Sequence, residues 1–283
     1  MTNKALTVSI VIPVYNEEGY LEACLEAVAR QTIKPLQVIV VNNNSTDKTV
    51  AIAKKYRFVE LSQAKPQGVT YARDLGFDNV QADIIGRIDA DTVLPPNWLQ
   101  TVIDIFTNDA RLDAISGPTG FYDLPGRGFS LWATKLIRTS LFYAGRRDSR
   151  YLFGSNMAVR RNAWQAVAGQ VCHQSGLHED NDLAIHLDRQ GFEVGYTNKL
   201  VADISVRRTD TKPRDSFKYA FSEYRTYRHH GIISLRAAVA GLILLAIYPG
   251  LKIMHRAYNP VTGRLSLKTY RTSKLVARPH PQI

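Results

Sequence analysis

Two aspartates stand one residue apart in the stretch 84–98, IIGRIDADTVLPPNW, directly after a run of apolar residues. Asp89 and Asp91 can present their carboxylates to one site if the chain turns between them. Carboxylate oxygens suit hard cations such as Mg2+ or Mn2+, and an ion held in this way can neutralise a departing diphosphate. Asp-x-Asp pairs are also common in exposed turns, so the surrounding sequence decides whether this pair indicates a cation site.

A second acidic cluster, HEDNDL at 178–183, indicates a different kind of chemistry. A carboxylate at the start of a helix in a partly closed site can act as a general base and take the proton of an attacking hydroxyl. The helix dipole favours acids in a first turn whatever their role. A capped helix without catalytic function therefore explains these residues equally well.

Short apolar runs alternate with segments of helical period through the first ninety residues. The pattern predicts strands at 6–15, 36–43, 57–62 and 82–89, with helices at 17–31, 47–56 and 67–80 between them. Such alternation favours an α/β fold with a mostly parallel sheet and helices on both faces. Ligands of such sheets lie beyond the carboxyl ends of the strands. The polar clusters 16–18, 42–47 and 89–91 fall at those ends, so one crevice can collect them.

Positive charge is concentrated near the C-terminus. The 283 residues carry a formal net charge of +11. Residues 205–283 hold 15 Lys and Arg against 3 acids, a net of +12, which leaves 21 against 22, or −1, for residues 1–204. A basic region of this kind favours an anionic partner, either a phospholipid surface or a nucleic acid. A solvated tail without a specific target is the alternative.

An uncharged run of 15 residues, 237–251, lies inside this basic region. A membrane span needs about 20 apolar residues, and Pro249 is expected to break the helix at its end. Because Arg236 precedes the run and Lys252, His255 and Arg256 follow it, a helix embedded in one leaflet is favoured over a crossing. The same observation disfavours nucleic acid as the partner. A buried helix of a soluble domain remains the other interpretation, and an amphipathic segment at 128–147 can cover the sheet or lie against the same membrane.

The cysteines and the N-terminus bear on where the protein works. Cys24 and Cys172 are the only cysteines, in no ligand-like spacing, so neither a disulfide framework nor a cysteine-built metal site is predicted. The N-terminal apolar run is interrupted by Pro13 and followed by acids, which is not typical of a signal peptide. We therefore expect a cytoplasmic protein that is peripheral or monotopic at the inner face of the membrane.

Five ordered segments together resemble glycosyltransferase family 2 on the nucleotide-sugar-binding fold called GT-A. They are VSIVIPVYNEE, VIVVNNNSTDKT, KPQGVTYARDLGFDNVQADIIGRIDADT, FGSNMAVRR and HEDNDL, within residues 6–206. The resemblance implies a nucleotide-sugar-binding and catalytic domain at 1–206, followed by a basic helical region at 207–283. It implies an inverting, metal-dependent hexosyltransferase that moves a sugar from a UDP- or GDP-linked donor to a hydroxyl of a glycan or glycolipid, in cell-envelope polysaccharide synthesis.

The resemblance also implies roles for individual residues. Asp180 is the expected general base, with Glu179 orienting the acceptor or the base, and His178 and Asp182 are weaker substitutes. Asp91 is the expected ligand of Mn2+ or Mg2+, with Asp89 at the ion, its bound water or the ribose. Donor-nucleotide contacts are expected from Pro13, Tyr15, Asn16, Glu17, Asn42, Asn43, Asn44, Lys65, Gly68, Arg73 and Asp89. Contacts to the acceptor or the donor sugar are expected from Gly154, Ser155 and Asn156.

Two departures from the family pattern leave alternatives open. The second loop reads NNNSTD where the family usually has Asp-Asp-Gly-Ser-x-Asp, so the choice between UDP and GDP stays open. Arg207 and Arg208 stand where relatives often supply a histidine ligand. An arginine cannot ligate an ion, so water or nucleotide completes the shell, or a basic side chain helps to hold the diphosphate. Transfer to a polyprenyl phosphate, a catalytically silent nucleotide-sugar-binding protein and a basic nucleic-acid-binding protein are the competing hypotheses.

Overall fold

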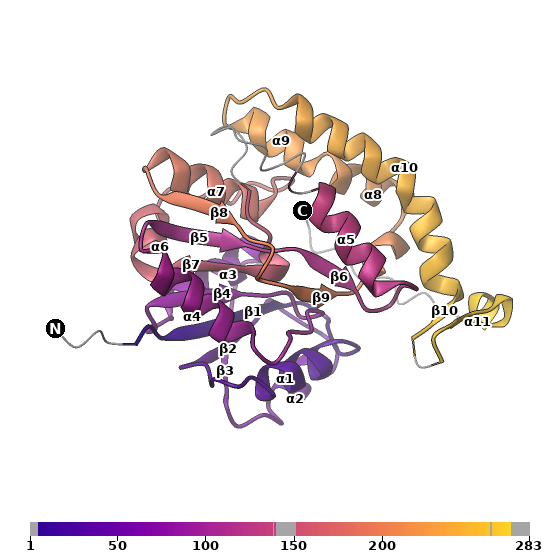
Figure 1. Ribbon diagram of the computed structural model, residues 1–283, viewed down its shortest axis with the longest axis horizontal. Helices are drawn as coiled ribbons and strands as arrows, with labels where there is room; N and C mark the ends of the chain where they lie inside the picture. Colours follow the sequence, from indigo (N-terminus) through magenta and orange to yellow (C-terminus); the bar gives the residue numbers. More distant parts are fainter. Residues whose placement is uncertain (1–4, 138, 140–150, 261, 273–283) are drawn as a thin grey trace.

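The structure is a computed structural model that describes residues 5–137, 139, 151–260 and 262–272. Its centre is an α/β unit in which strands and helices alternate along the chain (Figure 1). Parts of the amphipathic segment 128–147 and of the basic region 207–283 lie outside the described residues.

The main sheet is mostly parallel, as the sequence predicts. Its strands are β1 (Val8–Val14), β2 (Val38–Asn42), β3 (Val59–Gln63), β4 (Ile84–Arg87), β5 (Leu112–Ser116), β7 (Met157–Arg160) and β8 (Glu193–Tyr196). Within the described residues they form one seven-stranded sheet in the order β3-β2-β1-β4-β7-β5-β8. Only β7 runs antiparallel to its neighbours β4 and β5 in this sheet. The predicted fold class is confirmed.

Helices cover both faces of this sheet. They are α1 (Leu21–Ala29), α2 (Thr49–Ala53), α3 (Val69–Asp78), α4 (Trp98–Asn108), α6 (Arg161–Val167) and α7 (Glu179–Arg189). Buried residues of α1, α2 and α4 belong to the hydrophobic cluster on one face, and those of α3, α6 and α7 to the cluster on the other. Because both faces are covered, the central strands are continuous apolar runs.

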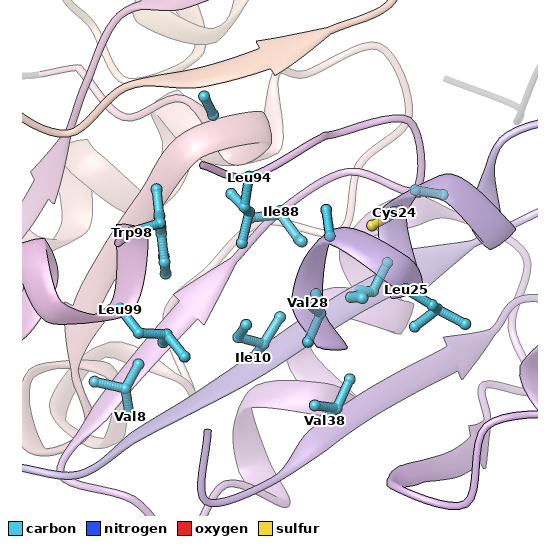
Figure 2. Close-up of a cluster of buried hydrophobic side chains, with 14 of the residues drawn as sticks. Val8, Ile10, Cys24, Leu25, Val28, Val38, Ile88, Leu94, Trp98 and Leu99 are labelled. Carbon is cyan, nitrogen blue, oxygen red and sulfur yellow. The ribbon is translucent and has the colours of Figure 1, made fainter. Parts of the chain in front are cut away.

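Alternation of side chains along β1 joins the two clusters. Val8 and Ile10 point into the first cluster, whereas Val11 belongs to the second. Figure 2 shows the first cluster, in which Val28 of α1 lies beside β1 and Trp98 of α4 packs over Gly86 of β4. The sheet is therefore a rigid support for the polar loops that follow its strands.

The loops after β1, β2, β3 and β4 leave the sheet at one edge, because these strands are parallel. A second, two-stranded sheet of β6 (Thr119–Phe121) and β9 (Ala202–Ile204) stands next to that edge. Val93 pairs with Asp203 of β9 through two backbone hydrogen bonds of 2.8 and 3.1 Å. This bridge brings the residues that follow β9 beside the loop that follows β4.

The C-terminal part adds helices around this edge. The remaining elements are α5 (Arg127–Ile137), the 3-10 turns η3 (Gly154–Asn156) and η4 (Arg207–Asp210), α8 (Pro213–Ala220), α9 (Ser222–His229), α10 (Leu235–Ala257), β10 (Tyr258–Asn259), β11 (Arg264–Leu265) and α11 (Leu267–Thr272). Helix α10 runs along the outside of the molecule and contacts η4, α8 and α9 (Figure 1). Asp210 of η4 holds its C-terminal end, through Nδ1 of His255 at 2.9 Å and Nε of Arg256 at 3.1 Å.

The apolar helix is longer than the sequence analysis predicts. A helix confined to 237–251 and ended by Pro249 is wrong, because α10 has 23 residues and Pro249 lies inside it. Proline removes one hydrogen bond to the preceding turn, but the helix continues on both sides of that gap. By length and composition α10 can cross a membrane, with a mean hydropathy of 1.9 in a window of which 17% is buried.

Candidate active site

Arg87, the last residue of β4, lies at the carboxyl edge of the sheet with three carboxylates around it. Its Nη2 is 3.1 Å from Oδ1 of Asp89 and 3.2 Å from Oε1 of Glu179. Its Nη1 is 3.7 Å from Oδ1 of Asp180. The Arg87 side chain is only 3% exposed, and a charge is buried at tolerable cost only when opposite charges pair with it. Arg87 therefore joins Glu179 and Asp180 to Asp89, although it is not among the predicted site residues.

Gly154 makes room for this arginine. A Cβ atom on Gly154 would lie 1.2 Å from Nη1 of Arg87 and 2.6 Å from Oδ1 of Asp180. The backbone N–H of Gly154 donates to Oδ2 of Asp180 at 2.8 Å. The absence of a side chain thus allows Arg87 and Asp180 to approach each other, and the amide orients the carboxylate.

The two adjacent acids at the start of α7 have pKa values that move apart. Burial raises the pKa of Asp180, and the nearby Arg87 only partly opposes it. Burial also acts to raise the pKa of Glu179, but the Arg87 guanidinium, with smaller contributions from His178 and Arg73, lowers that pKa on balance. Opposite shifts of neighbouring carboxyls divide their roles. Asp180 takes up a proton more readily than an ordinary aspartate, whereas Glu179 stays ionised.

A second buried arginine, Arg207 of η4, holds two other carboxylates of this edge. Its Nε donates to Oδ2 of Asp91 at 2.7 Å, and its Nη1 is 2.6 Å from Oε2 of Glu17. The guanidinium also lies 4.0 Å from the ring centre of Tyr20, within the range of a cation–π contact. The loops after β1 and β4 are therefore bridged by a residue that follows β9.

These pairings decide how well the predicted metal ligands fit an ion. Asp91 and Asp89 are paired with Arg207 and Arg87, so the cation position next to Asp91 is taken by a guanidinium. Within the described residues, the groups of three or more suitable donors include neither Asp89 nor Asp91: His178, Glu179 and Asp180 form one, and Cys172, Asp182, His186 and His230 form another. Asp89 and Asp91, in this arrangement, do not fit a Mn2+ or Mg2+ ion.

The asparagines of the second loop use their amides to hold neighbouring loops. Nδ2 of Asn43 donates to the Pro66 carbonyl at 2.6 Å, and its Oδ1 accepts from the Gly68 N–H at 2.8 Å. Nδ2 of Asn44 donates to the Lys65 carbonyl at 3.1 Å. The predicted nucleotide-binding residues of the second and third loops are thus brought together. Two of these three bonds use an amide donor that an aspartate lacks.

Side-chain oxygens of two asparagines accept hydrogen bonds that tie the first loop to the second and brace the second loop itself. Oδ1 of Asn16 accepts from the Thr46 N–H at 2.7 Å, and Oδ1 of Asn42 accepts from the Ser45 N–H at 3.0 Å. Asn16 and Asn44 both have positive φ, 54° and 65°, which asparagine tolerates better than most residues. Two further predicted residues, Pro13 near the end of β1 and Tyr15 directly after it, are both partly buried.

Arg73 points away from the edge and into the protein. It is fully buried, its Nη1 donates to the Glu179 carbonyl at 2.7 Å, and its Nη2 pairs with Asp74 at 2.7 Å. The guanidinium also lies 5.7 Å from the ring centre of Trp164. With these contacts Arg73 positions the first turn of α7, whereas the sequence analysis expects Arg73 to contact the donor nucleotide.

Asn156 is likewise fully buried. Its Nδ2 donates to the carbonyls of Pro118 and Leu200 at 3.1 and 2.7 Å, and its Oδ1 accepts from Nε1 of Trp98 at 2.8 Å. Its polar atoms are therefore committed inside the fold. Its neighbours Gly154 and Ser155 are also buried, but both line the pocket at this edge.

A pocket at the sheet edge collects part of the predicted site. Among its lining residues are the predicted Gly68, Asp89, Gly154, Ser155, Glu179 and Asp180. It is also lined by Arg87, Tyr71, His173, His178, Arg208 and Tyr219. Arg208 adds a positive charge and stacks on Tyr219 at 4.0 Å from its ring centre. The sequence offers one signal for Arg87, a charged residue inside the apolar run IIGRID. It offers none that places Tyr219 at this edge of the sheet.

A mostly parallel sheet with acidic and basic side chains converging at the carboxyl ends of its strands is the arrangement in which open α/β proteins bind their ligands. Residues 9–167, more than half of the chain, match the family model described as glycosyl transferase family 2. The chain therefore belongs to glycosyl transferase family 2.

Three relatives illustrate the range of similarity. An N-acetylglucosaminyltransferase of Azorhizobium caulinodans is 29% identical over 245 residues, which are 77% of this chain and 60% of the relative. A glucosyl-dolichyl phosphate glucuronosyltransferase of Haloferax volcanii is 23% identical over 204 residues, 64% of this chain and 61% of the relative. The glycosyltransferase GlyA of Streptococcus pneumoniae is 30% identical over 100 residues, 34% and 14% of the two chains. The chain covers less than two thirds of the length of each of these relatives.

Solved structures share the fold. A mannosyltransferase from Pyrobaculum calidifontis in complex with GDP-Man and Mn2+ superposes with a TM-score of 0.60 at 17% identity, over 88% of this chain and 76% of that one. S. aureus TarS 1–349 in complex with UDP-GlcNAc gives a TM-score of 0.59 at 16% identity, over 94% and 78% of the two chains. At these identities the likeness establishes the GT-A fold.

Replacing Gly154 by alanine tests the packing around Arg87. We expect Gly154→Ala to lower turnover at least tenfold, because the new methyl group displaces Arg87 and with it Glu179 and Asp180. Gly169→Ala is the matched control, since a Cβ there meets nothing within 4 Å. Turnover and thermal unfolding of both variants are compared with the wild type. Unchanged turnover in a folded Gly154→Ala variant would contradict the arrangement.

Proposed function

We propose that the chain is an inverting hexosyltransferase that moves a sugar from a UDP- or GDP-linked donor to a hydroxyl group of a lipid-linked or membrane-proximal glycan. The observation that carries this proposal is Asp180: a buried carboxylate with a raised pKa, at a helix start, in the pocket of a family 2 fold. A carboxylate of this kind accepts a proton near neutral pH better than an exposed one.

The reaction follows from these positions. The acceptor oxygen attacks the anomeric carbon from the side opposite the diphosphate, the bond from that carbon to the diphosphate oxygen breaks, and the hydroxyl proton passes to Asp180. The Gly154 N–H keeps the Asp180 carboxylate oriented, at 2.8 Å. Glu179, held anionic by Arg87, orients the acceptor. Ser155 is proposed to contact the sugar.

The donor nucleotide is proposed to lie over the tied loops that follow β1, β2 and β3. Pro13 at the end of β1 and Tyr15 and Asn16 in the first loop are proposed to contact it. Side-chain hydrogen bonds of Asn42, Asn43 and Asn44, with one from Asn16, hold these loops in shape. Lys65 and Gly68 stand at the third loop, and Asp89 is proposed to contact ribose. Arg73 and Asn156 are proposed to support the site from inside the protein.

The charge of the departing diphosphate needs a cation. The sequence predicts Mn2+ or Mg2+ on Asp91 and Asp89, and the P. calidifontis relative was solved with Mn2+. In this chain Arg207 pairs with Asp91 and Glu17 instead. An arginine is a permanent cation at physiological pH. We therefore propose that Arg207 stands in the place of the divalent ion and that Arg208, in the pocket, offers charge to the diphosphate.

A lipid-linked acceptor is supported by two observations. The H. volcanii relative is named as a glucosyl-dolichyl phosphate glucuronosyltransferase. Helices α5 and α10 also expose large apolar side chains, which are Phe129, Trp132, Leu136, Val239, Leu242, Ile243, Ile247 and Ile253. With the basic residues of the C-terminal region, such a surface suits the anionic inner face of a membrane. We propose that the protein is held there, on the cytoplasmic side.

A panel of UDP- and GDP-sugars, scored for release of the nucleoside diphosphate, tests the proposed activity. We expect one donor class to be cleaved, and turnover with a hydroxyl acceptor to fall at least a hundredfold in Asp180→Asn because the proton acceptor is lost. Asp188→Asn, on the same helix, is the control. A polyprenyl phosphate acceptor is already anionic, so turnover that survives Asp180→Asn would favour that alternative. Nucleotide binding without cleavage of any donor would indicate a catalytically silent protein.

Binding to vesicles tests the proposed membrane surface. We expect the purified protein to sediment with vesicles that contain anionic phospholipid, and the variant Leu242→Glu/Ile253→Glu to bind at least tenfold more weakly. Each buried apolar side chain contributes about 1.5–3 kcal/mol, and a charge in its place adds to the loss. Leu36→Glu, at a residue that is 54% exposed on another part of the chain, is the matched control. Equal binding of both variants would overturn the assignment of α10 to the membrane.

A further inference from the structure

Outside the pocket, a thiol, a carboxylate and two imidazoles converge where α7 meets α9. Cys172, Asp182, His186 and His230 each offer one ligand atom, and these atoms all lie within 4.8 Å of one another. Asp182 and His186 lie four residues apart on α7, so they face the same side of the helix. Cys172 precedes α7 in the chain and His230 follows α9. None of the four lines the pocket in which Asp180 lies.

The separations of these atoms are close to the edges of a tetrahedral site. Zinc–sulfur and zinc–nitrogen bonds of about 2.3 and 2.0–2.1 Å put sulfur and nitrogen about 3.5 Å apart, and nitrogen and oxygen about 3.3 Å apart. Sγ of Cys172 is 3.9 Å from Nε2 of His186, and Nε2 of His186 is 3.6 Å from Oδ1 of Asp182. Nε2 of His230 is 2.7 Å from the same Oδ1. Of these three pairs, only the last has to open by more than about 0.5 Å.

The carboxylate is already oriented toward the two imidazoles. Asp182 has a fully buried side chain, and its Oδ2 accepts from the Cys172 N–H at 2.8 Å. That bond leaves Oδ1 pointing to His186 and His230. A backbone hydrogen bond that fixes a ligating group is the usual support of a metal site. In the described part of the chain, the ion-pair partners of Asp182 are these two imidazoles, and no Lys or Arg pairs with it.

We propose that Cys172, Asp182, His186 and His230 bind one zinc ion. Sulfur and imidazole ligands select zinc over Mg2+ or Ca2+, which take oxygen ligands. For Nε2 of His230 to ligate, Nδ1 has to carry the proton. Arg189, whose Nη1 lies 3.1 Å from that Nδ1, then moves off it and keeps its 2.8 Å bond to the His230 carbonyl.

Four protein ligands leave no open position, which is the mark of a structural zinc site. Such an ion would join the segment before α7, α7 itself and the end of α9. The residues between Cys172 and α7 line the pocket, and α7 begins with Glu179 and Asp180. The zinc ion would therefore hold in place the helix that presents the proposed base, without taking part in the reaction.

Cobalt binding to the full-length protein tests the site directly. The protein is stripped with a chelator and titrated with Co2+, which reports thiolate ligation through a charge-transfer band and a tetrahedral site through its visible bands. We expect saturation at one ion per chain and displacement by one equivalent of Zn2+. Zinc should also raise Tm by about 5 °C or more, because an ion that binds only the folded state stabilises it. A folded wild type without the thiolate band would overturn the proposal.

Variants assign the ligands. Cys172→Ser and His186→Gln should each lose the thiolate band or the tetrahedral spectrum and weaken zinc binding at least a hundredfold. Cys24→Ala, which removes the other thiol, should change neither, and His229→Asn should also retain the ion although its Nε2 lies 3.7 Å from the Cys172 Sγ. A thiolate band that survives Cys172→Ser would mean another ligand set. Because the readouts are spectra, stoichiometry and Tm, the result does not depend on the donor or the acceptor.

Discussion

Two buried guanidinium groups hold the carboxylates of this sheet edge together. Arg87 gathers Asp89, Glu179 and Asp180, and Arg207 joins Asp91 to Glu17. Carboxylates this close would repel one another and lose their hydration without a cation between them. Removing one partner of a buried pair costs about 3–5 kcal/mol, so each arginine matters for folding as well as for charge. Burial acts to raise the pKa of both Glu179 and Asp180, and Arg87 acts to lower both. Burial prevails at Asp180, whereas Arg87, with smaller contributions from His178 and Arg73, prevails at Glu179.

The scaffold imposes these positions. Arg87 ends a strand buried on both faces, so its backbone is fixed by the packing of α1 and α4 on one side and α3 on the other. Arg207 reaches the loop after β4 because Val93 pairs with Asp203 just before it in the chain. The proposed C-terminal region therefore begins inside the site and not after it. Helices α8 and α9 complete the pocket through Tyr219 and Ser222.

Periodicity and motif order predict the fold well and the site in part. The apolar runs predict β1 to β4. The rule that parallel strands end at one edge of the sheet predicts that Asp89 and the second loop lie there together. The sequence does not predict in which direction the site side chains point. Arg73 has the spacing of a surface helical residue but turns inward to the Glu179 carbonyl. Arg207 donates a hydrogen bond to Asp91, which lies 116 residues earlier in the chain. Cys172 lies near His186 and His230 only because α7 packs on α9, so the spacing of these residues in the sequence does not predict the cluster.

Metal dependence of the wild type and of Arg207→His tests the role of the buried arginines most directly. The donor that the wild type cleaves is turned over with a chelator present and then with Mn2+ added. If Arg207 stands in the place of the ion, wild-type turnover is the same in both conditions. Arg207→His releases Asp91 and adds an imidazole that can ligate, so its turnover should be low with the chelator and rise at least tenfold with Mn2+. Wild-type turnover that is lost with the chelator and restored by Mn2+ would contradict the account.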